Sequence, residues 1–126
     1  MHGANRNADD YFRRGFQAAA AVGDQKSTVV VAPHFQTSSD NPASDELFWS
    51  SSGWKRGHLS STEGPRPRRS SYSAIDQIVD LLSDLARFPA LTEITMTGHS
   101  AGGQVAHRYA ATSRAEEIFR SMTMRY

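Results

Sequence analysis

The sequence predicts an α/β fold, because helical and extended stretches alternate along the chain. Three stretches carry apolar residues at helical spacing, and two short stretches between them have the composition of strands. The predicted order is helix, strand, long loop, helix, strand, helix. Alternation of this kind is typical of a parallel sheet whose strands are joined by right-handed crossovers. We therefore expect a short parallel sheet flanked by helices.

The first predicted helix covers residues 7–22. Asn7 is suited to cap its start, the aspartates at positions 9 and 10 complement the positive end of the helix dipole, and Gly23-Asp24 ends it. Its apolar residues fall on one face at helical spacing: Tyr11, Phe12, Phe16, Ala19 and Ala20.

Two strands are predicted. Residues 27–33, "STVVVAP", form a β-branched run that is apolar on both faces, as in a buried parallel strand. Residues 91–97, "LTEITMT", alternate well enough for a second strand.

The clearest helix is predicted at 73–88. Ser73 and Asp76 form a short version of a capping box, and Pro89 stops the helix. Its apolar stripe consists of Ile75, Ile78, Val79, Leu82, Leu85 and Phe88. Residues 101–113 return to helical spacing through Val105, Ala106, Tyr109 and Ala110.

A long segment at 33–71 separates the first strand from this helix. It is polar and rich in Ser, Gly, Pro and Arg, and it exceeds the usual length of a loop, which indicates a functional or partly disordered segment. The aromatic cluster Phe48, Trp49 and Trp54 argues against pure disorder. The run "GPRPRRSS" at 64–71 is typical of a solvated linker, and the alternative is a segment that contacts an acidic partner.

Composition narrows the function classes. The chain has 126 residues, 38% of them hydrophobic, with a formal net charge of +1 and no cysteine. The length predicts one small domain. The net charge is too small to produce an electrostatic field that would attract nucleic acid or a membrane surface. Without cysteine the chain can form no disulfide and no thiolate metal site. No signal peptide or transmembrane stretch is visible, so the cytoplasm is the expected location by default. No cofactor or metal is expected.

The residues "GHSAGG" at 98–103 are the candidate catalytic motif. A Gly-x-Ser-x-Gly run gains meaning when it lies between a strand and a helix, because a sharp turn there exposes the serine hydroxyl. The residues two before and two after the serine approach closely, and Gly98 and Gly102 meet that need. The backbone N–H of Ala101, at the first turn of the helix, would point toward a developing oxyanion. Ser100 is therefore the candidate nucleophile.

In these residues the chain resembles the serine hydrolases of the α/β-hydrolase fold. The resemblance rests on "GHSAGG" followed by "QVAHRYA", and on the histidine–glycine pair in "MHGANR" at the start. It implies a partial three-layer fold and acyl transfer to water from a small ester-like substrate. It also implies oxyanion donors at the amides of Ala4 and Ala101. His99 and Gly103 complete the turn as supporting residues.

A serine hydrolase also needs a base and an acid, which activate the hydroxyl. In this family the order is Ser, then Asp or Glu, then His, and only 26 residues follow Ser100. We therefore interpret residues 1–126 as an incomplete, internal piece of the domain with little activity alone. The resemblance places the strand that precedes His2-Gly3 between the two predicted strands. The residues "SMTMRY" at 121–126 look like the start of a further strand.

Other groups could substitute for the missing pair. His34 follows the end of a predicted strand, where α/β sites gather, and is the candidate substitute base, with an ordinary loop histidine as the alternative. His2 is expected to shape the oxyanion loop and His99 to pack in the turn. His58 and His107 are expected to be loop and surface residues, and Glu116 and Glu117 to be solvated charges rather than a catalytic acid.

Two questions stay open at this point. Phe48, Trp49 and Trp54 either line a substrate pocket or cap near Ser100, or form a hydrophobic cluster that holds the loop down. The second function class is a non-catalytic binding or interaction module, in which open sheet edges would favour self-association or a partner chain.

Overall fold

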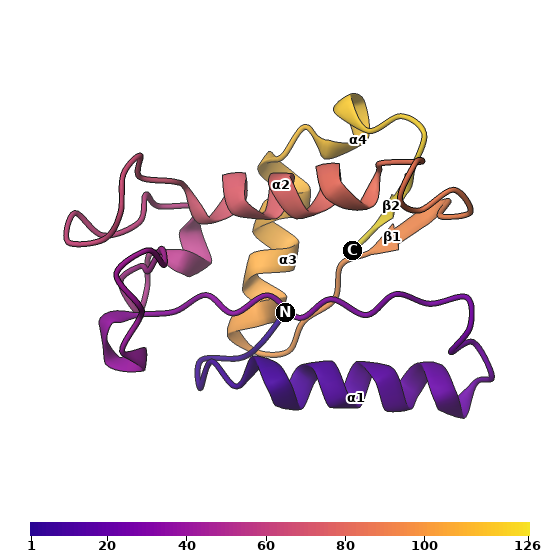
Figure 1. Ribbon diagram of the computed structural model, residues 1–126, viewed down its shortest axis with the longest axis horizontal. Helices are drawn as coiled ribbons and strands as arrows, with labels where there is room; N and C mark the ends of the chain where they lie inside the picture. Colours follow the sequence, from indigo (N-terminus) through magenta and orange to yellow (C-terminus); the bar gives the residue numbers. More distant parts are fainter.

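The computed structural model describes residues 1–126 and contains four α-helices and one two-stranded parallel sheet (Figure 1). The mixed α/β class predicted from the sequence is therefore present. The elements are α1 (Ala8–Ala21), α2 (Ser71–Leu82), β1 (Glu93–Thr95), α3 (Ala101–Thr112), α4 (Ala115–Ile118) and β2 (Thr123–Arg125). Two short 3-10 turns, η1 (Ser38–Asp40) and η2 (Trp54–Arg56), lie in the long segment.

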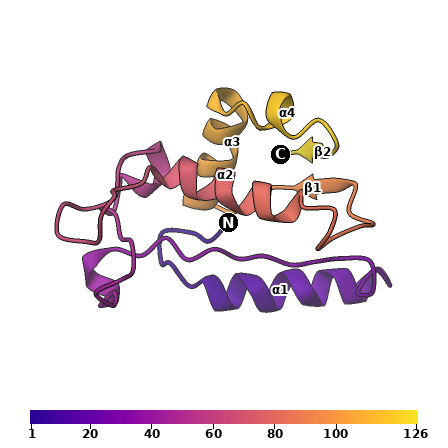
Figure 2. The same cartoon turned by 45° about the horizontal axis from the view of Figure 1, so that its top comes forward.

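The sheet pairs β1 with β2, in the register Glu93 with Thr123, Ile94 with Met124 and Thr95 with Arg125. The strand expected at the end of the chain is thus formed. Arg125 of β2 forms an ion pair with Glu93 of β1 across the sheet, and its Nε lies 2.6 Å from Glu93 Oε2. Helices α3 and α4 connect the two strands and lie together beside the sheet (Figures 1 and 2).

The predicted strand at 27–33 is wrong. No backbone group of residues 28–34 takes part in a hydrogen bond, and Val29 and Val31 are 51% and 44% exposed. The segment is extended but has no neighbouring strand to pair with, since β1 pairs with β2 instead. A run of β-branched residues favours an extended backbone, but a strand forms only when another strand lies beside it to pair with.

The main helix begins earlier and ends earlier than predicted. Ser70, not Ser73, caps α2: its Oγ accepts from the N–H groups of Tyr72 and Ser73 at 3.1 and 3.5 Å. The helix ends at Leu82, because Ser83 donates its hydroxyl to the carbonyl of Val79 at 2.8 Å and the chain then turns. A serine hydroxyl that competes for the helix carbonyls favours such an end.

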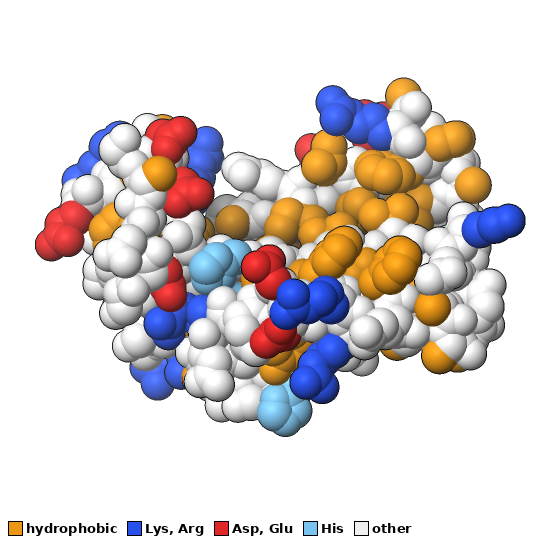
Figure 3. Space-filling model, turned by 60° about the horizontal axis from the view of Figure 1, so that its bottom comes forward, with side chains coloured by type: hydrophobic (Ala, Val, Ile, Leu, Met, Phe, Trp, Pro, Cys, Tyr) orange, Lys and Arg blue, Asp and Glu red, His pale blue; other side chains and the backbone are white.

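Helix α1 agrees with its predicted bounds to one residue at each end, and α3 ends one residue earlier than predicted. The apolar face of α1 is not covered. Phe12 and Phe16 are 47% and 49% exposed, and of the predicted stripe only Ala19 is buried. Asn7 stands at the cap position, but its side chain accepts no bond from the helix N–H groups, and its Nδ2 instead donates to Asp10 Oδ2. Figure 3 shows a face of the molecule on which hydrophobic side chains gather in a band.

The core lies between α2, α3 and the long segment at 33–71. That segment is folded, with an antiparallel bridge between Leu59 and Ser70 and a hydrogen bond from Ser61 N to Phe48 O at 2.7 Å. The buried cluster consists of Phe35, Trp49, Trp54, Ile75, Val79, Met96, Ala101, Val105, Ala106, Tyr109 and Ala115. No helix combines the length and the apolar character that crossing a membrane requires.

Candidate active site

Ser100 occupies the turn between β1 and α3 with an unusual backbone. Its φ is +55° and its ψ is −116°, a region that residues with a side chain rarely adopt. Its side chain is exposed and does not cap the helix. The turn therefore holds the hydroxyl out in solvent instead of using it for structure.

The glycines around Ser100 are needed for close approach. A Cβ on Gly98 would lie 2.6 Å from the carbonyl oxygen of Gly102, and a Cβ on Gly102 would lie 2.6 Å from the carbonyl oxygen of His2. A Cβ on Gly103 would meet Gly98 O at 3.2 Å, a tight contact. The steric need predicted for Gly98 and Gly102 is thus present, and it comes from backbone atoms that cannot move aside.

The amino-terminal segment packs against this turn. Gly102 lies under the carbonyls of Met1 and His2, and a Cβ on Gly3 would lie 3.7 Å from His99 O. The structure therefore brings the "HGAN" segment and the "GHSAGG" turn together, although almost the whole chain separates them in sequence.

His2 is a buried structural residue. It is 1% exposed, its Nδ1 donates to Gly3 O and its Nε2 accepts from Phe35 N, both at 2.9 Å. These partners fix the neutral tautomer, and burial lowers the pKa of the imidazole. His2 therefore ties the start of the chain to the long segment.

An ion pair fixes the loop that carries Ala4. Arg6, at φ +55°, places its Nε 2.6 Å from Asp40 Oδ2. Burial alone would raise the pKa of Asp40, but hydrogen bonds from Arg6 and Thr37 outweigh it and lower the pKa to about 2. Asp40 is therefore ionised at neutral pH and holds Arg6 in place.

The two predicted oxyanion donors have no protein acceptor. Neither the N–H of Ala4 nor that of Ala101 donates within the chain. Ala101 begins a helix of 12 residues, whose N-terminus carries a partial positive charge. The unpaired amide of Ala101 and the N-terminus of α3 can thus offer a favourable field to an anion beside Ser100.

No histidine or carboxylate side chain is hydrogen-bonded to Ser100. Of the five histidines, only His2 and His99 make side-chain hydrogen bonds, and His99 Nδ1 lies 3.4 Å from Tyr11 OH. The ring of His34 lies 5.8 Å from that of His2 and makes no side-chain hydrogen bond. Glu117 pairs with Arg114. Ser100, the candidate nucleophile, thus has no hydrogen-bonded proton acceptor, and the structure contains no cluster of side chains placed to bind a metal ion.

The aromatic cluster of the long segment lies mostly in the core. Trp54 is 1% and Trp49 4% exposed, and Phe35 stacks on Trp54 with ring centroids 5.9 Å apart. Phe48 and Trp49 line a cavity of about 800 Å³ that does not reach Ser100. These contacts match the interpretation of a cluster that holds the loop down. The contact between Tyr11 and His99 was missed, because nothing in the sequence relates two residues so far apart.

Comparison with protein-family models, with curated proteins and with solved structures gives no match to this chain. The functional argument therefore rests on the geometry of the residues themselves.

Proposed function

We propose that the chain carries the nucleophile and oxyanion part of a serine hydrolase site of the α/β-hydrolase type. Ser100 would attack an ester-like carbonyl, and the amides of Ala4 and Ala101 would hold the oxyanion. The observation that carries the proposal is the backbone of Ser100, whose positive φ presents an unbonded hydroxyl at the N-terminus of α3.

Strain of this kind costs about 1–3 kcal/mol and persists only where surrounding structure enforces it. A glycine at position 100 would adopt the same turn at little cost. The presence of serine there, with its hydroxyl free of structural bonds, supports a chemical role for the side chain.

The base and the acid do not come from residues near Ser100. We propose that they lie outside residues 1–126, so that the described chain acylates slowly and turns over little. Substrate binding and the oxyanion-holding amides still accelerate hydrolysis to some extent when the catalytic base and acid are absent.

The test is the reaction with p-nitrophenyl acetate, followed by release of p-nitrophenol and by mass spectrometry of the protein. We expect at most one equivalent of product per chain, an acetyl group on Ser100, and little turnover after it. Ser100→Ala abolishes this phase. Ser121→Ala, at an exposed serine outside the site, leaves it unchanged.

Two outcomes contradict the proposal. Acetylation spread over other residues, equal in Ser100→Ala, would show that the turn does not activate the serine. Steady turnover that is lost in Ser100→Ala would overturn the proposed lack of an internal base, and His34→Gln would then show whether His34 supplies it.

The second candidate is a non-catalytic interaction module. One observation favours it: the edge of β1 that faces away from β2 pairs with no other strand. Failure of Ser100 to react, together with stable association with another chain, would select this function over the hydrolase.

A further inference from the structure

A cavity of about 800 Å³ opens on the long segment at 33–71, and we call it the loop cavity. All of its lining residues belong to that segment, and Ser100 is not among them. Hydrogen bonds within the segment hold its walls, including the one from Ser61 N to Phe48 O at 2.7 Å. The loop cavity is therefore formed before any ligand enters, and what binds there is a question separate from the proposed hydrolase site.

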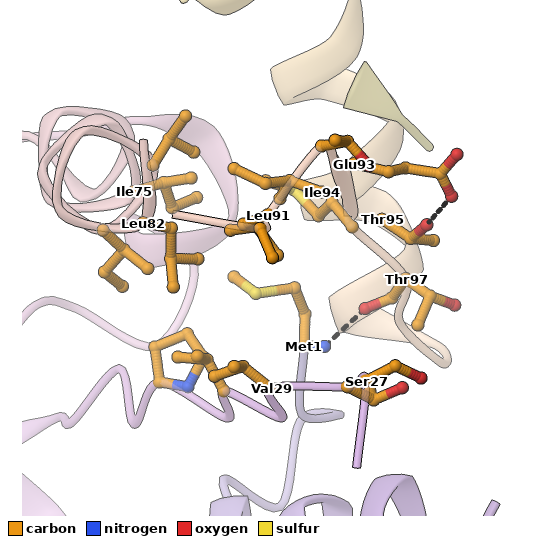
Figure 4. Close-up of a pocket in the computed structure, with 18 residues that line it drawn as sticks. Met1, Ser27, Val29, Ile75, Leu82, Leu91, Glu93, Ile94, Thr95 and Thr97 are labelled. Carbon is orange, nitrogen blue, oxygen red and sulfur yellow. Dashed lines mark hydrogen bonds between the residues drawn. The ribbon is translucent and has the colours of Figure 1, made fainter. Parts of the chain in front are cut away.

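Arg68 lines the loop cavity and has no anionic partner. Its Nε donates to the carbonyl of Ser60, whereas its Nη1 and Nη2 groups make no hydrogen bond and the side chain forms no ion pair. The cavity between residues 27–33, α2 and β1 differs, because its one charged side chain, Glu93, is already paired with Arg125 (Figure 4). A part-buried cation gains from an anion that enters beside it. The loop cavity thus offers a free guanidinium to a ligand.

Apolar side chains line the same cavity as Arg68. Phe48 is half-buried there, and Leu59 is 52% exposed although it belongs to the lining. A ligand that covers Phe48 and Leu59 removes apolar surface from water, which favours binding. The lining therefore suits a molecule with an apolar body and an anionic end.

The other charged and titratable groups at the cavity leave a positive balance. Arg66 lies at its edge, where Nη2 donates to the carbonyl of the lining residue Thr62 at 3.5 Å. Glu63 is the one carboxylate in the lining, and its side chain neither pairs with an arginine nor accepts a hydrogen bond. His58 also lines the cavity, and its ring makes no hydrogen bond. Two arginines against one carboxylate favour an anion.

We propose that the loop cavity binds a small organic carboxylate with an aromatic or aliphatic body, and that the carboxylate pairs with the Nη groups of Arg68. A guanidinium fork matches a carboxylate through two parallel hydrogen bonds. No α-helix begins among the lining residues, so the fork rather than a phosphate-binding helix end sets the preference. The volume lies in the range of small-molecule sites, about 300–1,000 Å³.

The test titrates phenylacetate into the isotope-labelled full chain and follows the backbone amides by NMR. We expect saturable shifts at the amides of Ser61, Thr62 and Glu63, and none at Ala101 beside the candidate nucleophile. Phenylacetamide has nearly the same shape without the charge and should bind roughly tenfold more weakly, the effect of losing a charged hydrogen-bonded pair. Acetate, which lacks the apolar body, should also bind more weakly than phenylacetate.

Variants separate pairing with Arg68 from general attraction to a cationic protein. Arg68→Gln should weaken the binding of phenylacetate roughly tenfold, whereas Arg14→Gln, at an exposed arginine of α1 that forms no ion pair, should leave it unchanged. Glu63→Gln removes the competing negative charge at an exposed position and should strengthen binding about two- to fivefold.

The proposal is overturned by equal binding of phenylacetate and phenylacetamide, by shifts that map away from the loop cavity, or by the absence of saturable binding. These three results use the unmodified chain, so they decide the matter even if Arg68→Gln does not fold. Unchanged binding in an Arg68→Gln variant that keeps the wild-type amide spectrum also overturns it, as does tighter binding of inorganic phosphate than of phenylacetate. None of these results depends on the reactivity of Ser100.

Discussion

The substitution Gly98→Ala tests whether the tight turn around Ser100 is built as described. The added Cβ would lie 2.6 Å from Gly102 O and 2.8 Å from Gly103 N. Both are backbone atoms at the start of α3, so relief requires a shift of the helix relative to β1. Overpacking of this kind costs about 1–3 kcal/mol, and we expect the upper part of that range because no side chain can yield.

Gly103→Ala is the matched control, because it adds the same methyl group one turn away. Its Cβ would meet Gly98 O at 3.2 Å, which a small adjustment relieves, and it lies within α3, where alanine gains up to about 1 kcal/mol over glycine. We therefore expect Gly103→Ala to change the free energy of unfolding little, and Gly98→Ala to lie roughly 2–3 kcal/mol below it.

The assay is urea unfolding followed by circular dichroism at 222 nm, with the free energies compared at equal slopes. The reasoning is refuted if Gly98→Ala unfolds within about 0.5 kcal/mol of Gly103→Ala, the scatter of ordinary surface substitutions. Such a result would mean that the close approach of the two backbones is not a feature of the folded protein.

Three further outcomes are expected from the same unfolding assay. Ser100→Gly should be about 1 kcal/mol more stable than Ser100→Ala, because only glycine relieves the positive φ. The pKa of Asp40 is lowered in the folded state from 3.8 to about 2, so its interactions with Arg6 and Thr37 add stability above pH 4 that is lost as pH falls toward 2; solvent screening reduces this contribution, and Asp40→Asn should remove about 1 kcal/mol and flatten this slope. Tyr109 donates to Asp76 at 2.6 Å while fully buried, so Tyr109→Phe should cost about 1–3 kcal/mol, measured against the wild type at pH 7.

Local chemistry in the sequence predicted the parts of the fold that depend on neighbours along the chain. The spacing in α1, α2 and α3 located three helices, and the glycines of "GHSAGG" indicated a turn whose contacts the structure contains. These signals are short in range, because helix periodicity and turn sterics involve residues a few positions apart.

The misses involve partners that are distant in sequence. Residues 27–33 have the composition of a strand, but a strand exists only when another backbone lies beside it, and none does. The burial of His2 against Phe35, and the folding of Trp49 and Trp54 into the core, depend on long-range packing that no local pattern encodes. The early end of α2 had a local cause, the Ser83 hydroxyl that donates to Val79 O. The prediction extended the helix past it because the apolar stripe continues to Phe88.

The most direct test of the central claim is to map where a fluorophosphonate probe modifies the protein. The reaction at pH 8 is followed by peptide mass spectrometry, in the wild type and in Ser100→Ala. We predict that Ser100 is modified faster than every other serine and that the label is lost in Ser100→Ala. Labelling distributed among exposed serines such as Ser121, with no preference for Ser100, would contradict the claim that this turn makes the hydroxyl a nucleophile.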